Sequence, residues 1–161
     1  NLIDILFLPL VWAFFHIIKV AFSTPLGSLS DRIGRKLVIN IGWGIYALVY
    51  VGFALLDQLP GSWQLAGTFA LFAIYALYYA FTEGVEKAFV ADLVKPEVRG
   101  SAFGMYNFAI GLGALPASVI FGLLYNVLGA TTAFATGALI AGVSMLLLAF
   151  GVQEKPMNAR A

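Results

Sequence analysis

The sequence contains no cysteine and a single histidine, so disulfides, thiolate chemistry and cysteine-ligated metal sites are excluded. Charge is also scarce, since only 11% of the 161 residues are Asp, Glu, Lys or Arg, against roughly 25% in a soluble domain. The basic residues are confined to a few short segments, and the net charge of +1 gives no reason to expect nucleic-acid binding. Hydrophobic residues make up 61% of the chain, and the mean hydropathy is +0.94. We therefore expect a polytopic membrane protein.

Two motifs of hydrolytic enzymes are missing as well. The sequence has no H-E-x-x-H and no G-x-S-x-G, and one histidine leaves little scope for acid–base chemistry. We therefore predict that the protein is not an enzyme, and we expect no cofactor and no metal site.

Long apolar runs alternate with short polar segments along the chain. A helix of about 20 apolar residues crosses the roughly 30 Å hydrocarbon layer of a bilayer. The sequence predicts an all-α, polytopic membrane helix bundle that forms a single transmembrane domain over residues 1–161. The expected spans are residues 5–26, 37–56, 63–94, 101–128 and 132–152. The second span has little polarity, and we expect it to be peripheral and lipid-facing.

Small residues recur every four positions in the last two expected spans. The two series are Ala109, Gly113 and Ala117, and Ala133, Gly137 and Ala141. Such ladders predict that another helix approaches closely.

A charged segment, Gly27–Lys36, separates the first two expected spans and has the sequence G-S-L-S-D-R-I-G-R-K. Its two glycines lack a Cβ atom, which predicts that two helix ends turn back on each other within this segment. Asp31 is expected to cap the start of the next helix or to meet the positive end of a neighbouring one. The alternative is a turn whose basic residues only mark the cytoplasmic side.

Polar side chains follow helical spacing in the first and third expected spans. One face of the first span carries Trp12, His16, Lys19 and Ser23, and one face of the third carries Tyr75, Tyr79, Glu83 and Glu86. A polar face in a membrane helix is expected to border protein or a water-filled cavity. The predicted substrate-cavity or coupling residues are His16, Lys19, Tyr75, Tyr79, Glu83 and, from the fourth span, Asn107. The alternatives are packing contacts for His16 and the tyrosines, and a Lys19 side chain that extends to the headgroups.

Apart from Lys19, which lies deep in the first span, the basic residues all fall on one side of the membrane when the spans are counted. That side carries Arg32, Arg35, Lys36, Lys87, Lys95, Arg99, Lys155 and Arg160, whereas the opposite side carries only Asp4 and Asp57. Since short basic loops stay inside, we expect the C-terminus in the cytoplasm and the N-terminal end outside.

The order of residues in Gly27–Lys36 resembles motif A, the loop signature of the major facilitator superfamily. The matching positions are Gly27, Leu29, Asp31, Arg32, Gly34, Arg35 and Lys36. Residues 83–104 and the G-A-L-P-A-S at 113–118 extend the resemblance to nearly the whole chain. Members of this superfamily usually have about twelve helices in two halves, with internal repeats and a central substrate cavity.

This resemblance implies a secondary active transporter that moves a small solute by alternating access. Because the sequence starts at Asn1 rather than Met, we expect a fragment of a larger permease. The predicted spans resemble helices eight to twelve, the C-terminal half without its first helix, and helices two to six of the N-terminal half are the alternative. The implied partners are a small-molecule substrate, a coupling proton or ion, the lipid bilayer and the other half of the transporter. The implied location is the plasma (inner) membrane, and the alternative function is a small membrane channel or an accessory membrane subunit.

The resemblance also implies roles for individual residues. In the family, the motif aspartate meets a helix end in the opposite half and helps to close the cytoplasmic side. That role falls to Asp31, with Arg35 in an ion-pair relay to a carboxylate on a neighbouring helix, which we expect to be Glu86. The implied gating residues are Gly27, Asp31, Arg32, Gly34, Arg35, Lys36, Glu86, Arg99 and Gly100.

Lys19 and Glu83 are expected to lie at the same depth in the membrane. Each is about ten residues, roughly 15 Å, inward from the motif side of its helix. An unpaired charge at that depth is costly. We therefore predict that the two side chains pair, and the resemblance supplies the assumption that their helices are neighbours.

Single cysteines test the orientation, because the sequence has none of its own. In the full-length protein, an impermeant thiol reagent added to cells should label Ser62→Cys and Asn126→Cys, which lie on the side without basic residues. It should spare Ser30→Cys and Asn158→Cys. Labelling of the Ser30 position from outside would contradict the orientation.

Overall fold

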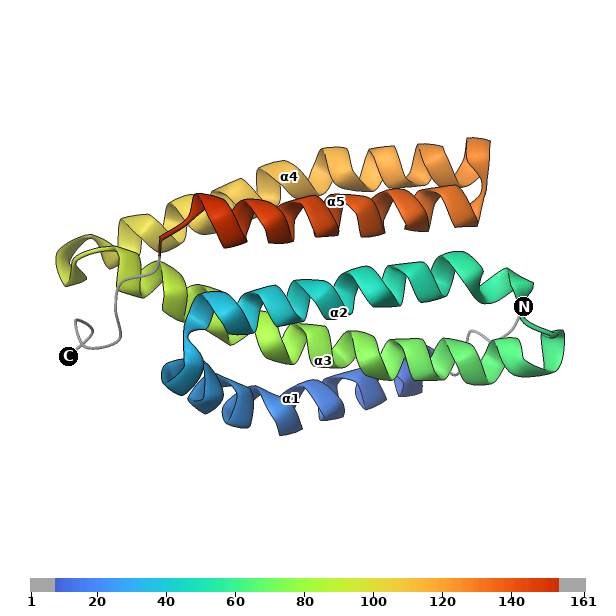
Figure 1. Ribbon diagram of the computed structural model, residues 1–161, viewed down its shortest axis with the longest axis horizontal. Coiled ribbons are helices and arrows are strands. Elements are labelled where there is room, and N and C mark those ends of the chain that lie inside the picture. The colour runs from blue at the N-terminus through green and yellow to red at the C-terminus, as the bar shows by residue number, and fades with distance from the viewer. Residues whose placement is uncertain (1–7, 154–161) are drawn as a thin grey trace.

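The computed structural model describes residues 8–153, which form a bundle of long antiparallel helices (Figure 1). The helices are α1 Leu8–Ile33, α2 Arg35–Leu55, α3 Gly61–Leu93, α4 Arg99–Leu128 and α5 Ala130–Gly151. Two short 3-10 helices, η2 Leu56–Gln58 and η3 Pro96–Val98, lie in the α2–α3 and α3–α4 connections. No strand occurs within the described range. The 5 long helices are each long and apolar enough to cross a membrane, which confirms the predicted all-α, polytopic fold.

The prediction of one long third helix is confirmed. α3 continues without a break through the charged residues at 83–87 to Leu93. It ends just before Lys95, which precedes Pro96, because the proline ring disfavours the helical conformation in the residue before it. α4 and α5 begin slightly earlier than expected, at Arg99 and Ala130.

The charged segment Gly27–Lys36 is not the compact two-glycine turn that the sequence predicts. α1 continues through most of it, and only Gly34 leaves the helical conformation, with φ of 103°. Gly27 lies inside α1, with no atom within 4 Å of the position that a Cβ would take. One glycine is enough because a positive φ redirects the chain at a single residue. Asp31 also lies inside α1 and therefore does not cap α2, which has no side-chain cap.

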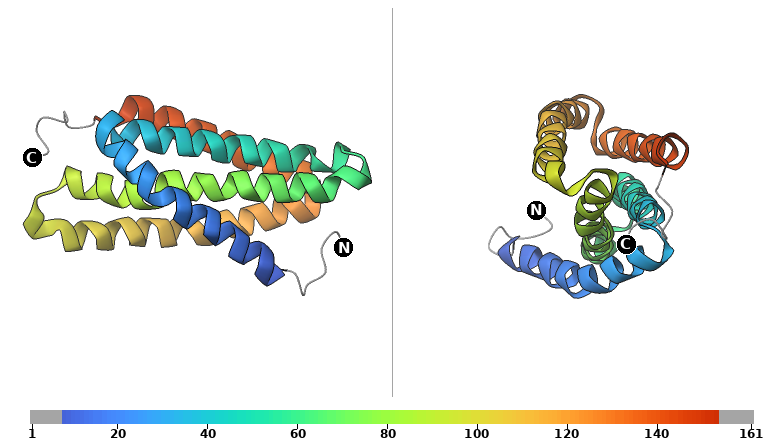
Figure 2. Two further views of the ribbon diagram at one scale, coloured as in Figure 1. Left: turned by 90° about the horizontal axis from the view of Figure 1, so that it is seen from below. Right: turned by 90° about the vertical axis from the view of Figure 1, so that its left-hand side faces the viewer.

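α2 is the most buried span of the described bundle, so the expectation that it is peripheral and lipid-facing is wrong for this part of the chain. It lies between α3 and α5 (Figure 2). Its residues Val38, Ile39 and Val49 are at most 2% exposed. The expectation fails because a helix buried among other membrane helices is as apolar as one that faces lipid.

Close helix approach depends on glycines at which the neighbouring helix leaves no room for a side chain, as at Gly42 and Gly137. A Cβ atom on Gly42 of α2 would lie 2.5 Å from Thr82 of α3, and one on Gly137 of α5 would lie 2.5 Å from the ring of Tyr50. Small residues favour packing in lipid, where dispersion contacts drive association. The small-residue ladder predicted for α5 therefore makes a close helix contact at Gly137. In the ladder predicted for α4, no atom lies within 4 Å of the position that a Cβ would take on Gly113.

Ser30 proves unsuitable as a labelling site. Its side chain is 1% exposed, and its Oγ donates a hydrogen bond to the Gly27 carbonyl at 2.7 Å. A cysteine there would be spared on either side of the membrane. The exposed Ser28 is the better reporter for this side, and Asn158 lies outside the described residues.

Gly34 and Gly27 form a matched pair that tests the turn geometry. In the full-length protein, Gly34→Ala should lower the melting temperature, because alanine at φ 103° carries strain of about 1–3 kcal/mol. Gly27→Ala should leave the melting temperature unchanged or raise it, because alanine is favoured over glycine inside a helix by about 1 kcal/mol. Thermal melts in detergent compare the two variants, and equal melting temperatures would contradict the assigned turn.

Candidate functional site

An ionic network holds α1, α2 and α3 together at the motif end of the bundle, the end that contains Gly27–Lys36. Arg35, at the start of α2, places its Nε 2.7 Å from Asp92 Oδ2 at the end of α3. Its Nη2 lies 3.2 Å from Asp31 Oδ1 in the last turns of α1. The Arg35 and Asp92 side chains are mostly buried, whereas the Asp31 side chain is 63% exposed. Asp31 therefore extends beyond the described bundle while Asp92 anchors the arginine.

Glu86 is not the partner of Arg35, which corrects the expected relay. Among the described residues, the carboxylates paired with Arg35 are Asp92 and Asp31. Asp92 lies nearly two turns further along α3 than Glu86 and so reaches the motif end. The sequence does contain a signal for this contact, because Asp92 stands on the same side of the membrane as the motif.

Lys36, the next motif residue, joins the start of α2 to the end of α5. Its Nζ donates hydrogen bonds to the carbonyls of Ala149 and Val152, both at 2.6 Å. The last carbonyls of a helix have no partner within the helix and carry a partial negative charge, so a lysine there is favourable. Sequence reasoning missed this contact because nothing in the spacing links positions more than 100 residues apart.

The structure does not bring Arg32, Arg99 and Gly100 into this network. All three are exposed, and neither arginine forms an ion pair with another described residue. Gly100, in the first turn of α4, has no atom within 4 Å of its Cβ position. Their predicted gating role is therefore not supported by contacts inside the described bundle.

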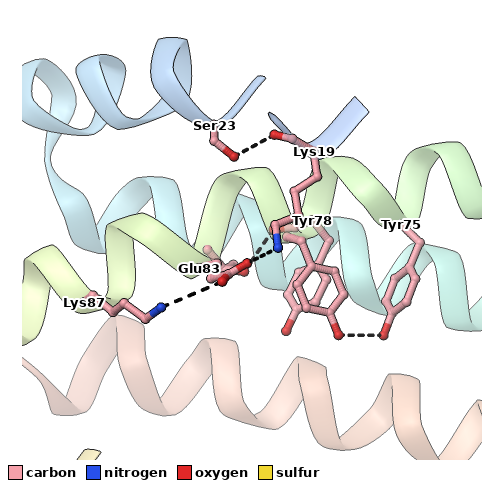
Figure 3. Close-up of polar contacts among 8 residues, drawn as sticks. Lys19, Ser23, Tyr75, Tyr78, Glu83 and Lys87 are labelled. Carbon is pink, nitrogen blue, oxygen red and sulfur yellow. Dashed lines mark hydrogen bonds and ion pairs between the residues drawn. The ribbon is translucent and has the colours of Figure 1, made fainter. Parts of the chain in front are cut away.

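Deeper in the bundle, Lys19 of α1 forms an ion pair with Glu83 of α3 (Figure 3). Lys87 Nζ lies 3.7 Å from the other Glu83 oxygen, and Lys19 Nζ lies 5.8 Å from the centre of the Tyr79 ring. The contact between Lys19 and Glu83 that the sequence predicts is thus present, and α1 and α3 are neighbours as the resemblance implied. The Lys19 side chain is 21% exposed and that of Glu83 is 43% exposed, so the pair has an open side.

Aromatic residues extend this pair along the α1–α3 interface. The hydroxyl groups of Tyr75 and Tyr79 lie 3.5 Å apart, and the ring of Phe15 packs against both. His16 packs edge-on against Trp12 and Phe15. The predicted cavity residues His16, Lys19, Tyr75, Tyr79 and Glu83 therefore gather at one interface.

Glu86 faces a different part of the molecule, so the predicted polar stripe of α3 divides. Its Oε1 accepts a hydrogen bond from Trp43 Nε1 of α2 at 3.0 Å, and its Oε2 accepts one from the Tyr106 hydroxyl of α4 at 2.6 Å. One carboxylate thus links α2, α3 and α4. Sequence reasoning missed Trp43 and Tyr106, because an aromatic donor in an apolar span carries no pattern of its own.

A groove of about 770 Å³ lies beside Glu86 and between α2, α3, α4 and α5. Its aromatic wall includes Tyr46, Tyr50 and Tyr78. Asn107 does not line this groove but is exposed on α4, where its side-chain amide donates to the Phe103 carbonyl at 2.9 Å. Within the described residues, no cluster of His, Asp and Glu is suited to hold a metal ion.

Comparison with known proteins identifies the family of the chain. Residues 3–161 match the family model described as Major Facilitator Superfamily. The chain is 38% identical over 140 residues to an uncharacterised MFS-type transporter of Methanocaldococcus jannaschii, an alignment that covers 87% of this chain and 33% of that protein. It is 29% identical over 158 residues to the class C tetracycline resistance protein of Escherichia coli, with 92% of this chain and 37% of that protein covered.

A third relative is an uncharacterised MFS-type transporter of Bacillus subtilis, which is 31% identical over 133 residues, 81% of this chain and 30% of that protein. No solved structure gives a significant match. The chain therefore spans about a third of the length of the curated relatives it matches. Since the family model covers nearly every residue and the helices have the length and composition of membrane spans, the chain belongs to the major facilitator superfamily.

Proposed function

We propose that the parent protein is a secondary active transporter that moves a small solute by alternating access, and that residues 1–161 are helices eight to twelve of its C-terminal half. The observation that carries the proposal is the family match over residues 3–161. Transport in this superfamily involves rocking of two helical halves around a central site. The remainder of the transporter, including the other half, is the partner of the described bundle.

The Lys19–Glu83 pair supports a polar pathway on the open side of the α1–α3 interface. Charged residues inside a membrane protein are costly, so they face a bundle interior or a water-filled cavity and mark ion or substrate pathways. The 43% exposure of the Glu83 side chain leaves the pair accessible from that side. We infer that Lys19, Glu83, His16 and the two tyrosines of this interface border the substrate cavity, where a coupling proton or ion also acts.

The motif end supplies the second part of the proposal, a cytoplasmic gate. Arg35 is anchored to Asp92, and Asp31 is left with most of its carboxylate exposed. A carboxylate at the positive end of a helix is stabilised by up to about 2 kcal/mol when partly buried. Asp31 is therefore positioned to contact a helix in the other half when the cytoplasmic side closes.

The orientation of the bundle in the membrane follows from the basic residues at the motif end. Antiparallel helices place Arg32, Arg35, Lys87, Lys95 and Arg99 at the motif end. By the positive-inside rule this end faces the cytoplasm, with the C-terminus on that side of the plasma membrane.

A solute screen on the purified full-length protein tests the transport function. A solute that binds the folded state stabilises it, and the melting temperature rises as the solute concentration exceeds the dissociation constant. One relative is a tetracycline resistance protein, so tetracycline is the first compound to examine. Solutes that raise the melting temperature should then be carried across reconstituted vesicles by the full-length protein, and the absence of transport for every stabilising solute would count against the proposal.

Exchanging the charges of Lys19 and Glu83 tests whether their pairing matters. Lys19→Ala and Glu83→Ala should each lower transport and stability. The loss in free energy of unfolding should fall between the value for an exposed ion pair, up to about 1 kcal/mol, and the value for breaking a buried pair, about 3–5 kcal/mol. The double variant Lys19→Glu with Glu83→Lys should recover part of it.

Lys87→Ala is the matched control, because Lys87 is more exposed and lies 3.7 Å from Glu83. It should change melting temperature and transport only slightly. If the damage in the double variant equals the sum of the damage in Lys19→Glu alone and in Glu83→Lys alone, the pair carries no coupling.

Asp31→Asn separates a gate from a simple basic turn. An exposed ion pair between residues four apart is worth only about 0.3–0.5 kcal/mol, so the melting temperature should change little. Transport by the full-length protein should nevertheless fall, because a lost contact of about 1–2 kcal/mol shifts a two-state equilibrium roughly five- to thirty-fold. Asp57→Asn is the control, because Asp57 is an exposed carboxylate at the opposite end of the bundle, and it should leave transport unchanged. Unchanged transport in Asp31→Asn would show that the segment is a basic turn without a gating role.

A further inference from the structure

Glu86 differs from the other two carboxylates in the inner half of α3. Glu83 and Asp92 each form an ion pair with a basic side chain of another helix. Among the described residues, Glu86 forms no ion pair, and its hydrogen-bond donors are the neutral Trp43 indole at 3.0 Å and the Tyr106 hydroxyl at 2.6 Å. Proton uptake at Glu83 or Asp92 would break a salt bridge. Glu86 is therefore the carboxylate of this helix that can take up a proton without losing an ionic contact.

Glu86 is also the titrating group of its own surroundings. Within the described residues, it is the one charged side chain that lines the groove of about 770 Å³, and α5 has no charged residue. On α3, Glu83 contacts Lys87 and turns toward Lys19 of α1 (Figure 3). The titratable groups around Glu86 are tyrosines, namely Tyr46 and Tyr50 of α2, Tyr78 of α3 and Tyr106 of α4. Since tyrosine hydroxyls stay protonated below about pH 9, a change of charge at this site belongs to Glu86.

The two halves of α4 are attached to the bundle in different ways. In the outer half, the ring of Phe121 packs against Tyr50 of α2 and Phe134 of α5. In the inner half, on the motif side of Pro116, Tyr106 donates the hydrogen bond that reaches Glu86 of α3. No described residue of α4 is buried, and Pro116 interrupts the backbone hydrogen bonds between the two halves. The position of the inner half therefore depends on the contact between Tyr106 and α3.

The strength of this contact depends on the protonation state of Glu86. Hydrogen bonds to an ionised acceptor are shorter and roughly twice as strong as those between neutral groups. When a proton from water adds to one carboxylate oxygen, the charge is lost and that oxygen becomes a hydroxyl group. The Trp43 indole can only donate, and the Tyr106 hydroxyl would have to turn from donor to acceptor to bind the new hydrogen. Proton uptake therefore weakens the attachment of Glu86 to both α2 and α4.

We propose that Glu86 is a proton-binding latch for the inner half of α4. As a carboxylate it holds this half against α2 and α3 through Trp43 and Tyr106, and as a neutral acid it releases it. The site is separate from the Lys19–Glu83 pair, which stays intact when Glu86 changes its protonation state. A part in transport, as a link between proton binding and movement of α4, rests on the proposed function of the parent protein.

Distances between nitroxide labels on introduced cysteines test the latch, because residues 1–161 contain no cysteine that would interfere. The reporter pair in the full-length protein is Ser28→Cys in α1 and Ser101→Cys in α4, both exposed at the motif end. Pulsed electron paramagnetic resonance follows their distance from about pH 8 to about pH 4, which spans the ordinary titration of a carboxyl group. Both labels lie in the described bundle, so rocking of two halves against each other leaves their distance unchanged. A second distance population should grow several-fold as the pH falls.

Two variants remove the latch in different ways. Glu86→Gln keeps the shape of the side chain without its charge, and it should show the second population at every pH. Tyr106→Phe removes the donor and should do the same, which keeps the test decisive if Glu86→Gln fails to fold. Glu97→Gln is the matched control, because Glu97 is an exposed carboxylate just before α4 and its loss should leave the pH response intact.

A label pair at the outer ends of the helices serves as the second control. Ser62→Cys in α3 and Asn126→Cys in α4 are exposed, and their distance should not respond to pH. The measurement needs no solute, so its result is independent of whether the protein transports one. Distances at the motif end that do not respond to pH, or a pH response that persists in Glu86→Gln, would overturn the proposal.

Discussion

The ion pair between Lys19 and Glu83 is the interaction on which the arrangement of α1 depends. α1 makes few contacts with α2 once the chain leaves Gly34, and most of its packing is against α3. A lysine and a glutamate in the middle of membrane-spanning helices are costly unless they pair or face a water-filled cavity. Their pairing fixes the rotation of both helices and gathers His16 and the tyrosines on the same interface.

Backbone geometry at Gly34 and charge pairing at Arg35 act together at the motif end. The positive φ of Gly34 turns the chain within one residue, so Arg35 and Lys36 emerge next to the ends of α3 and α5. Arg35 then pairs with Asp92, and Lys36 binds the terminal carbonyls of α5. The segment 34–36 therefore connects the ends of α1, α2, α3 and α5, while most of the Asp31 side chain stays exposed.

Hydropathy and helical spacing predicted the number of spans and the long third helix, because span length is a property of the sequence itself. The Lys19–Glu83 contact was predicted from the matching depths of the two charges together with the family resemblance, which supplied the assumption that their helices are neighbours. The rotation of each helix was harder to predict. α2 is central although its sequence resembles that of a lipid-facing helix, since lipid and protein present the same apolar environment. Glu86 belongs to the same spacing pattern as Glu83 but faces Trp43 and Tyr106. The partner of Arg35 likewise depends on which carboxylate reaches the helix end.

Counterflow in vesicles that contain the full-length protein tests the central claim of a carrier most directly. Vesicles are loaded with excess unlabelled solute, beginning with tetracycline and then any solute that stabilises the protein, and are diluted into a trace of the labelled compound. A carrier that exposes its site to one side at a time should accumulate the label transiently above its external concentration. Labelled solute that only equilibrates, without an overshoot, would indicate a channel and would contradict the account.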